Sequence, residues 1–206
     1  MKLSIVIYDQ FTDLDLFLMW DLLNRVRLPE WEVRILGERP YHTSATGISA
    51  PTHGLIEESN HSDVVLFVSG QGARTKMKDS DWLSRFRIDP EKQLIGSICS
   101  GALLLAALGF LKGKTATTYP TTKQTLESLG VTVEEKAFIE HGNIATAGGC
   151  LASQYLVGWV IEKKASAEWK QLVLKSIQPV GAGLYFSDAA ELEKLYAPVL
   201  STHGKI

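Results

Sequence analysis

The stretch around Cys99 carries the strongest chemical signal in this sequence. An apolar run, residues 94–98, leads directly into Cys99, and the small residues Ser100, Gly101 and Ala102 follow it. A strand that turns sharply into a helix forms a nucleophile elbow, which lifts one side chain above the sheet. The positive end of the helix dipole would lower the pKa of a thiol held there. The pattern therefore predicts a nucleophilic Cys99, although a buried structural cysteine would occupy a similar apolar context.

Two acidic residues near the amino terminus are candidate partners for that thiol. Asp13 and Asp15 follow the first apolar segment and open a helical pattern. A carboxyl group that shares a proton with a thiolate can act as both general acid and general base. An acidic residue in the first turn of a helix is also favourable because of the helix dipole alone. The residues by themselves leave both the catalytic and the structural explanation open.

The elements that would position these residues alternate between strands and helices. Strands are expected at residues 3–8, 31–36, 64–68 and 93–98, with shorter ones at 116–119, 131–134, 137–140 and 144–147. Helices are expected at 13–25, 81–87, 100–111, 121–129, 151–163 and 167–177, with a hairpin at 43–53 and a weak helical pattern at 189–196. This alternation predicts a flavodoxin-like α/β fold, a three-layer α-β-α sandwich with a mostly parallel central sheet.

The functional residues should then gather at one edge of the sheet. Ligands of open α/β sheets bind at the carboxyl ends of the strands. Asp13, Asp15, the turn formed by Gly70, Gln71 and Gly72, and Cys99 all follow predicted strands. We therefore expect them to converge around one small-molecule site.

Composition bounds the class of protein. The 206 residues fit one α/β domain, and the formal net charge of −2 gives no broad attraction for nucleic acid. No apolar run is long enough to span a membrane, and the amino terminus lacks a signal-peptide pattern. Two cysteines, Cys99 and Cys150, in such a chain indicate reduced thiols and a cytoplasmic location. With no Cys/His cluster in the sequence, neither a metal nor another cofactor is expected.

Two glycine-rich stretches resemble nucleotide-binding loops but fail in detail. The turn at Gly70 and Gly72 has Thr75 where a dinucleotide fingerprint has its third glycine, and it follows the third strand instead of the first. Residues 109–115 have three residues between the glycines where a phosphate loop has four, and they follow a helix. Both stretches are interpreted as ordinary turns.

The residues around Cys99 resemble the ThiJ/PfpI superfamily, the branch of the class I glutamine amidotransferase-like fold that carries a cysteine elbow. The likeness rests on SICSGA at 97–102, the apolar helix behind it, GKTATT at 113–118, FTDLDL at 11–16 and GNIATAGG at 142–149. It covers about residues 3–177 and leaves 178–206 as a tail. Within the superfamily it is greatest to the isonitrile hydratases, which implies hydration of isonitriles to N-substituted formamides without a cofactor.

The resemblance assigns roles to the candidate residues. It makes Cys99 the nucleophile, which would form a covalent thioimidate, and Asp15 its acid and base. The match and the flanking Leu14 and Leu16 favour Asp15 over Asp13.

Three further positions bear on the pocket. Ser100 stands where the hydratases carry a catalytic-site hydroxyl residue, so its backbone N–H and hydroxyl are both expected to face the substrate. N–H groups around Gly70 and Gln71 would complete an anion-stabilising pocket. Tyr119 stands where many relatives carry a histidine, which makes peptidase-like and deglycase-like activities less expected. Cys150 is expected to pack structurally at a helix start.

The resemblance also implies a homodimer with the site near its interface. Phe17, Leu18, Met19 and Trp20 are consecutive, so apolar groups should reach the surface unless the 43–53 hairpin or the tail covers them. Two alternative functions stay open at this point. One is a glyoxalase-like or deglycase-like enzyme for reactive carbonyls, and the other is a non-enzymatic redox-sensing or small-molecule-binding module whose Cys99 oxidises to a sulfinate.

Overall fold

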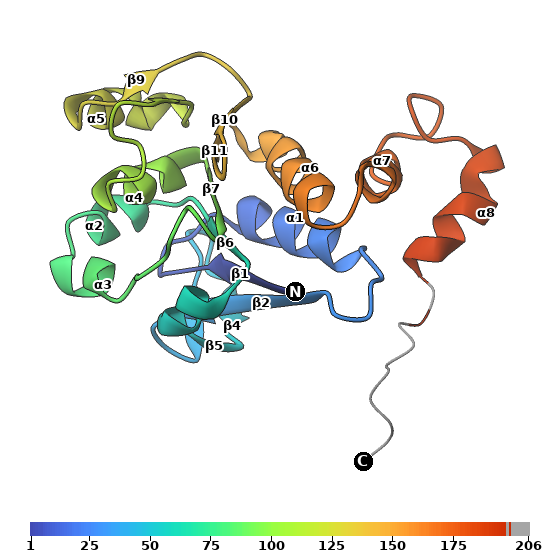
Figure 1. Cartoon of the computed structure of the whole chain (residues 1–206), viewed down its shortest axis with the longest axis horizontal. Coiled ribbons are helices and arrows are strands. Elements are labelled where there is room, and N and C mark those ends of the chain that lie inside the picture. Colours follow the sequence, from blue (N-terminus) through green and yellow to red (C-terminus); the bar gives the residue numbers. More distant parts are fainter. Residues whose placement is uncertain (197, 199–206) are drawn as a thin grey trace.

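A seven-stranded sheet runs through the centre of the computed structural model, which describes residues 1–196 and 198 (Figure 1). The strand order is β10-β11-β7-β6-β1-β2-β5. Every neighbouring pair is parallel except β10 and β11, which form an antiparallel hairpin at one edge. The strands are β1 (Lys2–Val6), β2 (Glu32–Gly37), β5 (Gly54–Leu55), β6 (Val64–Phe67), β7 (Leu94–Ile98), β10 (Phe138–His141) and β11 (Ile144–Ala147).

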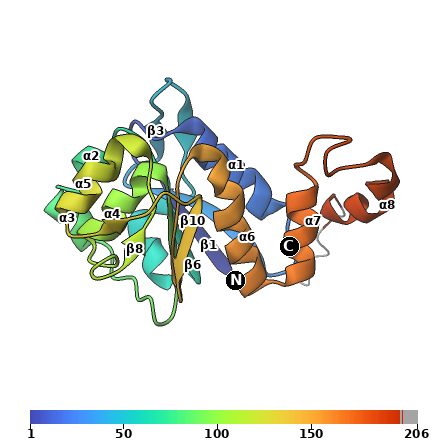
Figure 2. The same cartoon turned by 90° about the horizontal axis from the view of Figure 1, so that it is seen from above.

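Helices cover both faces of this sheet (Figures 1 and 2). One face carries α1 (Asp13–Asn24) and α6 (Ser153–Lys164), with α7 (Ala167–Lys175) packed on α6. The other face carries α2 (Ala73–Lys76), α3 (Ser80–Ser84), α4 (Ala102–Ala107) and α5 (Lys123–Ser128). The predicted three-layer sandwich with a mostly parallel sheet is therefore confirmed.

The central strands are apolar because neither of their faces meets water. Every residue of β6 and β7 is buried, as expected for parallel strands covered by helices on both sides. Packing is close at Gly96, where an added methyl group would lie 2.8 Å from Cδ1 of Leu156 and 2.9 Å from Cδ2 of Leu66. Strand β7 thus lies directly against α6, which begins after β11 at the edge of the sheet where β7 ends.

Two pairs of short strands lie outside the central sheet. The predicted excursion at 43–53 is an antiparallel hairpin of β3 (Tyr41–Thr43) and β4 (Ser49–Pro51). The predicted strands at 116–119 and 131–134 are shorter than expected and pair in parallel with each other, as β8 (Thr115–Ala116) and β9 (Thr132–Val133). These two strands form a small sheet of their own, and the sequence pattern alone did not distinguish them from strands of the central sheet.

Several predicted helices are shorter than their sequence patterns. The apolar helix after Cys99 begins as a 3₁₀ turn, η2 (Cys99–Gly101), and α4 ends at Ala107 because Gly109 adopts a positive φ of 84°. The predicted 121–129 helix likewise begins as a 3₁₀ turn, η3 (Pro120–Thr122), and α3 ends three residues before the predicted boundary at 87. The remaining 3₁₀ segments are η1 (Ile56–His61), η4 (Cys150–Ala152), η5 (Phe186–Asp188) and η6 (Glu193–Leu195).

The described part of the tail packs at the carboxyl-terminal end of α1. Arg27 Nε donates a hydrogen bond to the carbonyl of Leu195 at 2.7 Å, and Leu195 is buried. The weak helical pattern at 189–196 corresponds to α8 (Ala189–Leu192) followed by η6, beyond α7 (Figure 2). Among residues 1–196 and 198, no helix has the length and apolar character that a membrane crossing requires.

Candidate active site

Cys99 occupies a strained position at the junction of β7 and η2. Its φ is 50°, in the left-handed region that a residue with a side chain seldom adopts. The turn is held tightly, because a methyl group at Gly101 would lie 2.7 Å from the carbonyl oxygen of Val68 and 2.8 Å from that of Phe67. Cys99 is buried, with 2% of its surface exposed, yet it lines a cleft. The strand, the strained cysteine and the following helix have the geometry of a nucleophile elbow.

Asp15 lies beside this thiol, and Asp13 does not. Asp15 is fully buried in the first turn of α1, and an oxygen of its carboxyl group lies within 4.8 Å of the Cys99 sulfur. Asp13 accepts a hydrogen bond from the Thr46 hydroxyl at 2.8 Å, so it is directed to the β3–β4 hairpin. The geometry therefore separates two aspartates that the sequence left only two positions apart.

The Asp15 carboxyl group has the properties of a proton carrier. Burial raises its pKa, although the Ser69 hydroxyl and the thiols of Cys150 and Cys99 act in the opposite direction. The Ser69 hydroxyl donates to Oδ2 of Asp15, whereas Oδ1 is buried and has no hydrogen-bond partner within the described chain. A carboxyl group with a raised pKa and an uncommitted oxygen can exchange a proton with a neighbouring group.

The pKa of the Cys99 thiol differs from the value expected from the sequence. Burial raises its pKa well above the ordinary value, and the nearby Asp15 carboxylate and Cys150 raise it further, while the backbone N–H of Gly149 acts to lower it. The expectation of a pKa below the ordinary value, based on the helix dipole, was wrong because desolvation and a like charge outweigh a short helical turn. A proton transfer from Cys99 to Asp15 would form the thiolate and at the same time neutralise the carboxylate that raises the thiol pKa.

The Ser100 side chain and the Gly70 backbone are joined by two hydrogen bonds. Gly70 N–H donates to the Ser100 hydroxyl oxygen at 2.9 Å, and that hydroxyl donates to the Gly70 carbonyl oxygen at 3.1 Å. The Gly70 N–H that was expected to face an anion is therefore already occupied. No larger residue fits there, because φ is 144° and a methyl group would lie 2.0 Å from the carbonyl oxygen of Gln10. Gln71 is exposed at the same turn and lines the cleft.

The cleft above these residues has a volume of about 260 Å³. Arg74 is the cation in its lining, and its Nη2 donates to the Thr121 hydroxyl at 3.0 Å. Tyr119 also lines it and is 44% exposed. The lining residues are Thr12, Ala45, Ser69, Gly70, Gln71, Arg74, Cys99, Ser100, Tyr119, Thr121 and Cys150. Sequence reasoning did not single out Arg74 or Thr121, although Arg74 stands two residues after the predicted glycine turn.

Cys150 also lines the cleft, which corrects the expectation that it only packs structurally. Its sulfur, the Cys99 sulfur and an Asp15 oxygen all lie within 4.8 Å of one another, a donor set that could hold a metal ion. Cys150 is half-buried, and burial together with Asp15 raises its pKa to about 11. The strand register explains why the two cysteines lie close together. Ile98 of β7 pairs with Ala147 of β11, so both cysteines follow the ends of neighbouring strands.

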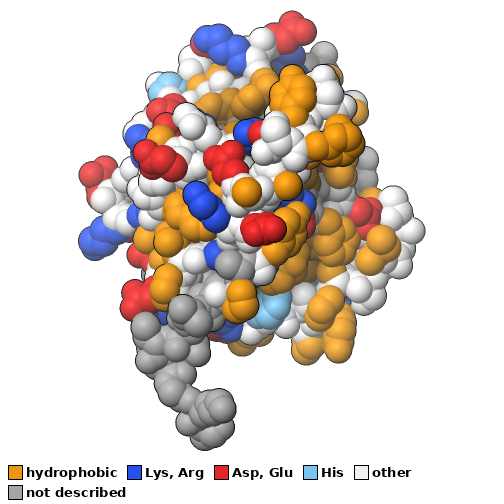
Figure 3. Space-filling model, turned by 90° about the vertical axis from the view of Figure 1, so that its right-hand side faces the viewer, with side chains coloured by type: hydrophobic (Ala, Val, Ile, Leu, Met, Phe, Trp, Pro, Cys, Tyr) orange, Lys and Arg blue, Asp and Glu red, His pale blue; other side chains and the backbone are white. Residues whose placement is uncertain are grey.

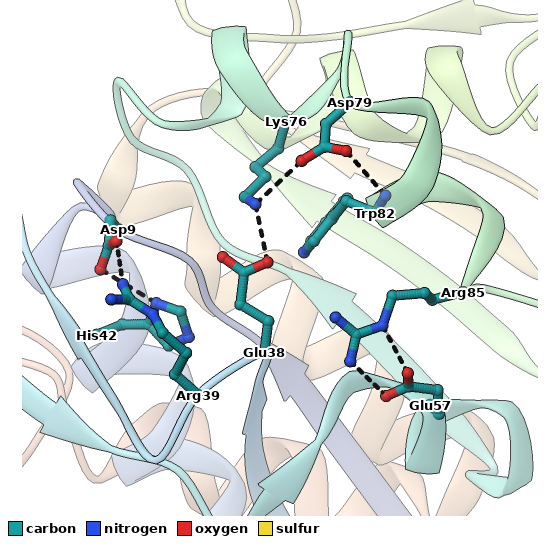
Figure 4. Close-up of polar contacts among 9 residues, drawn as sticks. All are labelled: Asp9, Glu38, Arg39, His42, Glu57, Lys76, Asp79, Trp82 and Arg85. Carbon is teal, nitrogen blue, oxygen red and sulfur yellow. Dashed lines mark hydrogen bonds and ion pairs between the residues drawn. The ribbon is translucent and has the colours of Figure 1, made fainter.

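A set of ion pairs holds the loops behind the glycine turn (Figure 4). The Asp9 carboxylate accepts a hydrogen bond from the backbone N–H of Thr43 at 3.2 Å, contacts Nδ1 of His42 at 3.2 Å and pairs with Arg39. A methyl group at Gly72 would lie 2.0 Å from the carbonyl oxygen of Asp9. The loop after β1 thus supports the turn that borders the cleft.

Lys76 of α2 ties the same region to the loop after β2. Its Nζ lies 2.9 Å from an oxygen of Glu38 and 3.3 Å from an oxygen of Asp79 (Figure 4). His42 is buried, and burial lowers its pKa, so it is neutral near pH 7. These contacts fix the scaffold of the cleft and place no charge beside Cys99.

Comparisons with known proteins agree with this geometry. The model of the DJ-1/PfpI family matches residues 1–163. The chain is 27% identical over 175 residues to an isonitrile hydratase from Pseudomonas putida, covering 84% of this chain and 76% of that protein. It is 29% identical over 121 residues to the protein dj-1beta of Drosophila melanogaster, covering 58% of this chain and 65% of that protein.

Solved structures show the same fold. DJ-1 of Schizosaccharomyces pombe superposes with a TM-score of 0.74 at 18% identity, covering 87% of this chain and 100% of that one. A ThiJ/PfpI family protein from Pseudomonas syringae gives a TM-score of 0.76 at 17% identity, covering 95% and 86%. At these identities the structures support the fold and leave the reaction to be argued from the site.

Proposed function

This chain belongs to the DJ-1/PfpI family, and on that premise we propose that it is a cysteine-dependent hydro-lyase that converts isonitriles to N-substituted formamides. The observation that carries the proposal is the buried Asp15 carboxyl group within 4.8 Å of the sulfur of Cys99, which lines a cleft. Hydration of an isonitrile requires a nucleophile with a proton carrier close to it. The likeness to a curated isonitrile hydratase supports the choice of substrate class.

The reaction begins with the shared proton. Asp15 accepts the thiol proton of Cys99, and the thiolate attacks the terminal carbon of the isonitrile while Asp15 returns the proton to that carbon. The product is a thioimidate in which the Cys99 sulfur is bound to the former isonitrile carbon. The raised pKa of Asp15 suits this role, because its two protonation states lie closer in free energy near neutral pH than those of an ordinary aspartate.

Hydrolysis of the thioimidate completes the cycle. Asp15 takes a proton from water, the resulting hydroxide adds to the thioimidate carbon, and Asp15 gives its proton to the substrate nitrogen. The C–S bond then breaks as the added hydroxyl becomes the formamide carbonyl, and the hydroxyl proton passes through Asp15 to the Cys99 sulfur. The isonitrile has then gained the elements of one water molecule and leaves as a formamide. The Cys99 thiol and the Asp15 carboxylate are regenerated, so no redox or organic cofactor takes part in the balance.

Arg74 is proposed to select the substrate. Its guanidinium lines the cleft, hydrogen bonds to a neutral hydroxyl, and forms no ion pair with a described carboxylate. An anionic substituent would therefore meet an uncompensated positive charge at the cleft. We expect isonitriles that carry a carboxylate to bind more tightly than neutral ones of similar size.

The proposed assembly is a homodimer formed through the face beside the active site. Leu14 and Phe17 on α1 are 48% and 40% exposed, and Leu151 on η4 and Tyr155 on α6 are 69% and 48% exposed. Helices α1 and α6 pack against each other, and both cover the same face of the sheet (Figure 2). Leu14 and Leu151 are the sequence neighbours of Asp15 and Cys150, which would place the interface beside the site.

A second surface with exposed hydrophobic residues is the alternative interface for this dimer. Hydrophobic side chains are scattered among charged ones on the side of the molecule that carries α7 and α8 (Figure 3). The exposed residues in that part of the chain include Val180, Tyr185, Phe186 and Tyr196. None of these four residues lines the cleft, so we propose the α1–α6 face as the interface.

One assay tests the proposed function. The purified full chain is incubated with cyclohexyl isonitrile or isocyanoacetate, and formamide formation is followed by chromatography. Turnover that Cys99→Ala abolishes is the expected result. Parallel incubation with methylglyoxal tests the reactive-carbonyl alternative, and consumption of methylglyoxal without any formamide from either isonitrile would overturn the proposal.

A further inference from the structure

Two thiols and one carboxyl group meet at the base of the cleft, and hydration uses only one of the thiols. We propose that Cys150 is a resolving cysteine, which attacks Cys99 after a hydroperoxide has oxidised it to a sulfenic acid and so forms an intramolecular disulfide. The inference rests on the nucleophilic Cys99 of the proposed function, and it does not depend on isonitrile turnover.

The topology brings the two sulfurs together. Cys99 directly follows β7, Cys150 lies three residues after β11, and these strands are parallel neighbours in the sheet. The sulfurs lie within 4.8 Å of each other, and an S–S bond of about 2.05 Å requires side-chain rotation to close the remaining distance. Cys150 is half-buried and borders the cleft, so open space lies beside it for that rotation.

The first step is oxidation of Cys99 inside the cleft. The volume of about 260 Å³ admits a small hydroperoxide. Asp15 accepts the thiol proton, the Cys99 thiolate attacks one peroxide oxygen, and the O–O bond breaks. The leaving hydroxide or alkoxide receives the proton from Asp15. Sulfur loses two electrons, which the peroxide gains, and the products are a sulfenic acid and water or an alcohol.

The second step joins the two cysteines. Asp15 is also within 4.8 Å of the Cys150 sulfur, so it can accept that thiol proton in turn. The Cys150 thiolate attacks the Cys99 sulfur, the S–O bond breaks, and the hydroxide leaves as water with the proton held by Asp15. No further oxidant is consumed, because the sulfenic acid already carries the oxidising equivalent.

The proximity of Cys150 decides the fate of the sulfenic acid. A second peroxide molecule would carry Cys99 to the sulfinate, which ordinary thiols do not reduce. Attack by Cys150 is intramolecular and needs no diffusing reactant, so it should outcompete that second oxidation at low peroxide concentration. The pair would therefore protect the nucleophile and make its oxidation reversible by thiols.

The test uses the full-length reduced protein and hydrogen peroxide. Because the chain contains only two cysteines, loss of two hydrogen masses from the monomer identifies a Cys99–Cys150 bond without ambiguity. We expect that mass change in the wild-type protein, its reversal by dithiothreitol, and a linked peptide containing both cysteines. In Cys150→Ser we expect a gain of two oxygen atoms on Cys99 that dithiothreitol does not reverse, with about tenfold more sulfinate than in the wild type at equal dose.

Three outcomes would overturn the inference. One is a wild-type protein that gains oxygen at Cys99 as readily as Cys150→Ser does. Another is a disulfide that links two chains on a non-reducing gel and leaves no linked monomer. The third is the absence of a linked peptide from peroxide-treated wild-type protein, which decides the matter even if the serine variant fails to fold.

Discussion

The hydroxyl group of Ser100 holds both backbone polar groups of Gly70, accepting from its N–H at 2.9 Å and donating to its carbonyl oxygen at 3.1 Å. This exchange joins the elbow after β7 to the glycine turn after β6. Ser100 is therefore a positioning residue for the cleft, and it is not the free substrate-facing donor that its sequence position suggested. Its removal leaves the buried N–H of Gly70 without its partner, whereas the Gly70 carbonyl oxygen still accepts from the Ala73 N–H at 3.2 Å.

Ser100→Ala should lower the free energy of unfolding by about 1–3 kcal/mol, the usual cost of unsatisfied buried polar groups. Formamide production should fall as well, because the turn beside Cys99 loses its anchor. Ser100→Thr keeps the hydroxyl and is the matched variant. Urea denaturation measures the stability change, and an alanine variant as stable and active as the wild type would contradict the role.

Asp15→Asn should reduce kcat for isonitrile hydration by about 10²- to 10⁴-fold, because asparagine cannot exchange a proton. Asp13→Asn is the matched control, since Asp13 binds Thr46 of the hairpin instead of facing the thiols. Steady-state kinetics on both variants provide the measurement. Equal losses in the two variants would show that the helix start, and not proton transfer, explains the effect.

Asp15 also predicts a pH dependence of stability. Burial raises the pKa of Asp15 in the folded state. Its contribution to the free energy of unfolding is therefore most favourable below the pKa of an unfolded aspartate, about 3.9. That contribution is lost as the pH rises through the higher folded-state pKa. Asp15→Asn removes this dependence and should melt at a higher temperature than the wild type near neutral pH. Thermal melts at several pH values measure it, and a variant that is less stable above that window would contradict the assignment.

The Asp15 carboxylate should also affect the pKa of the Cys99 thiol. Burial and the Asp15 carboxylate both raise the pKa of Cys99, so removing the carboxylate charge should lower that pKa. Iodoacetamide labelling of Cys99 against pH, read by mass spectrometry, gives the pKa in the wild type and in Asp15→Asn. An unchanged or higher pKa in the variant would show that Asp15 does not act on the thiol.

Arg74→Gln should raise KM for isocyanoacetate about tenfold, within the range for a hydrogen bond to a charged group, and should change KM for cyclohexyl isonitrile little. The difference between the two substrates isolates the charge from any general loss of structure. Arg74→Lys retains the positive charge and should recover part of the preference. Equal effects on both substrates would remove Arg74 from substrate selection.

Leu151→Glu should shift the chain to monomer mass, because a charge placed in an apolar interface opposes association. Phe186→Glu is the matched control on the α7–α8 side and should leave the assembly intact, although Phe186 is 89% exposed. Light scattering coupled to gel filtration gives the masses. A wild-type protein that runs at monomer mass at all concentrations, or an assembly lost only in the Phe186 variant, would contradict the proposed interface.

The sequence determined the strands, the main helices and the elbow. Apolar runs such as 94–98 predict buried parallel strands whatever their partners, and Cys99 followed by small residues predicts a sharp turn, because both signals depend only on residues close in the chain. The interpretation of 70–72 and 109–115 as ordinary turns rests on the same kind of local pattern.

The tertiary structure decided which groups meet and what their surroundings do to them. Cys150 and Arg74 reach the cleft because the strand order places β11 and β6 on either side of β7, a relation that no local pattern contains. The pKa of Cys99 is raised, where the sequence led us to expect a lowered pKa, because its surroundings are set by the tertiary structure. Desolvation and the charge on Asp15 depend on the distance between residues far apart in sequence, and only the packed fold sets that distance.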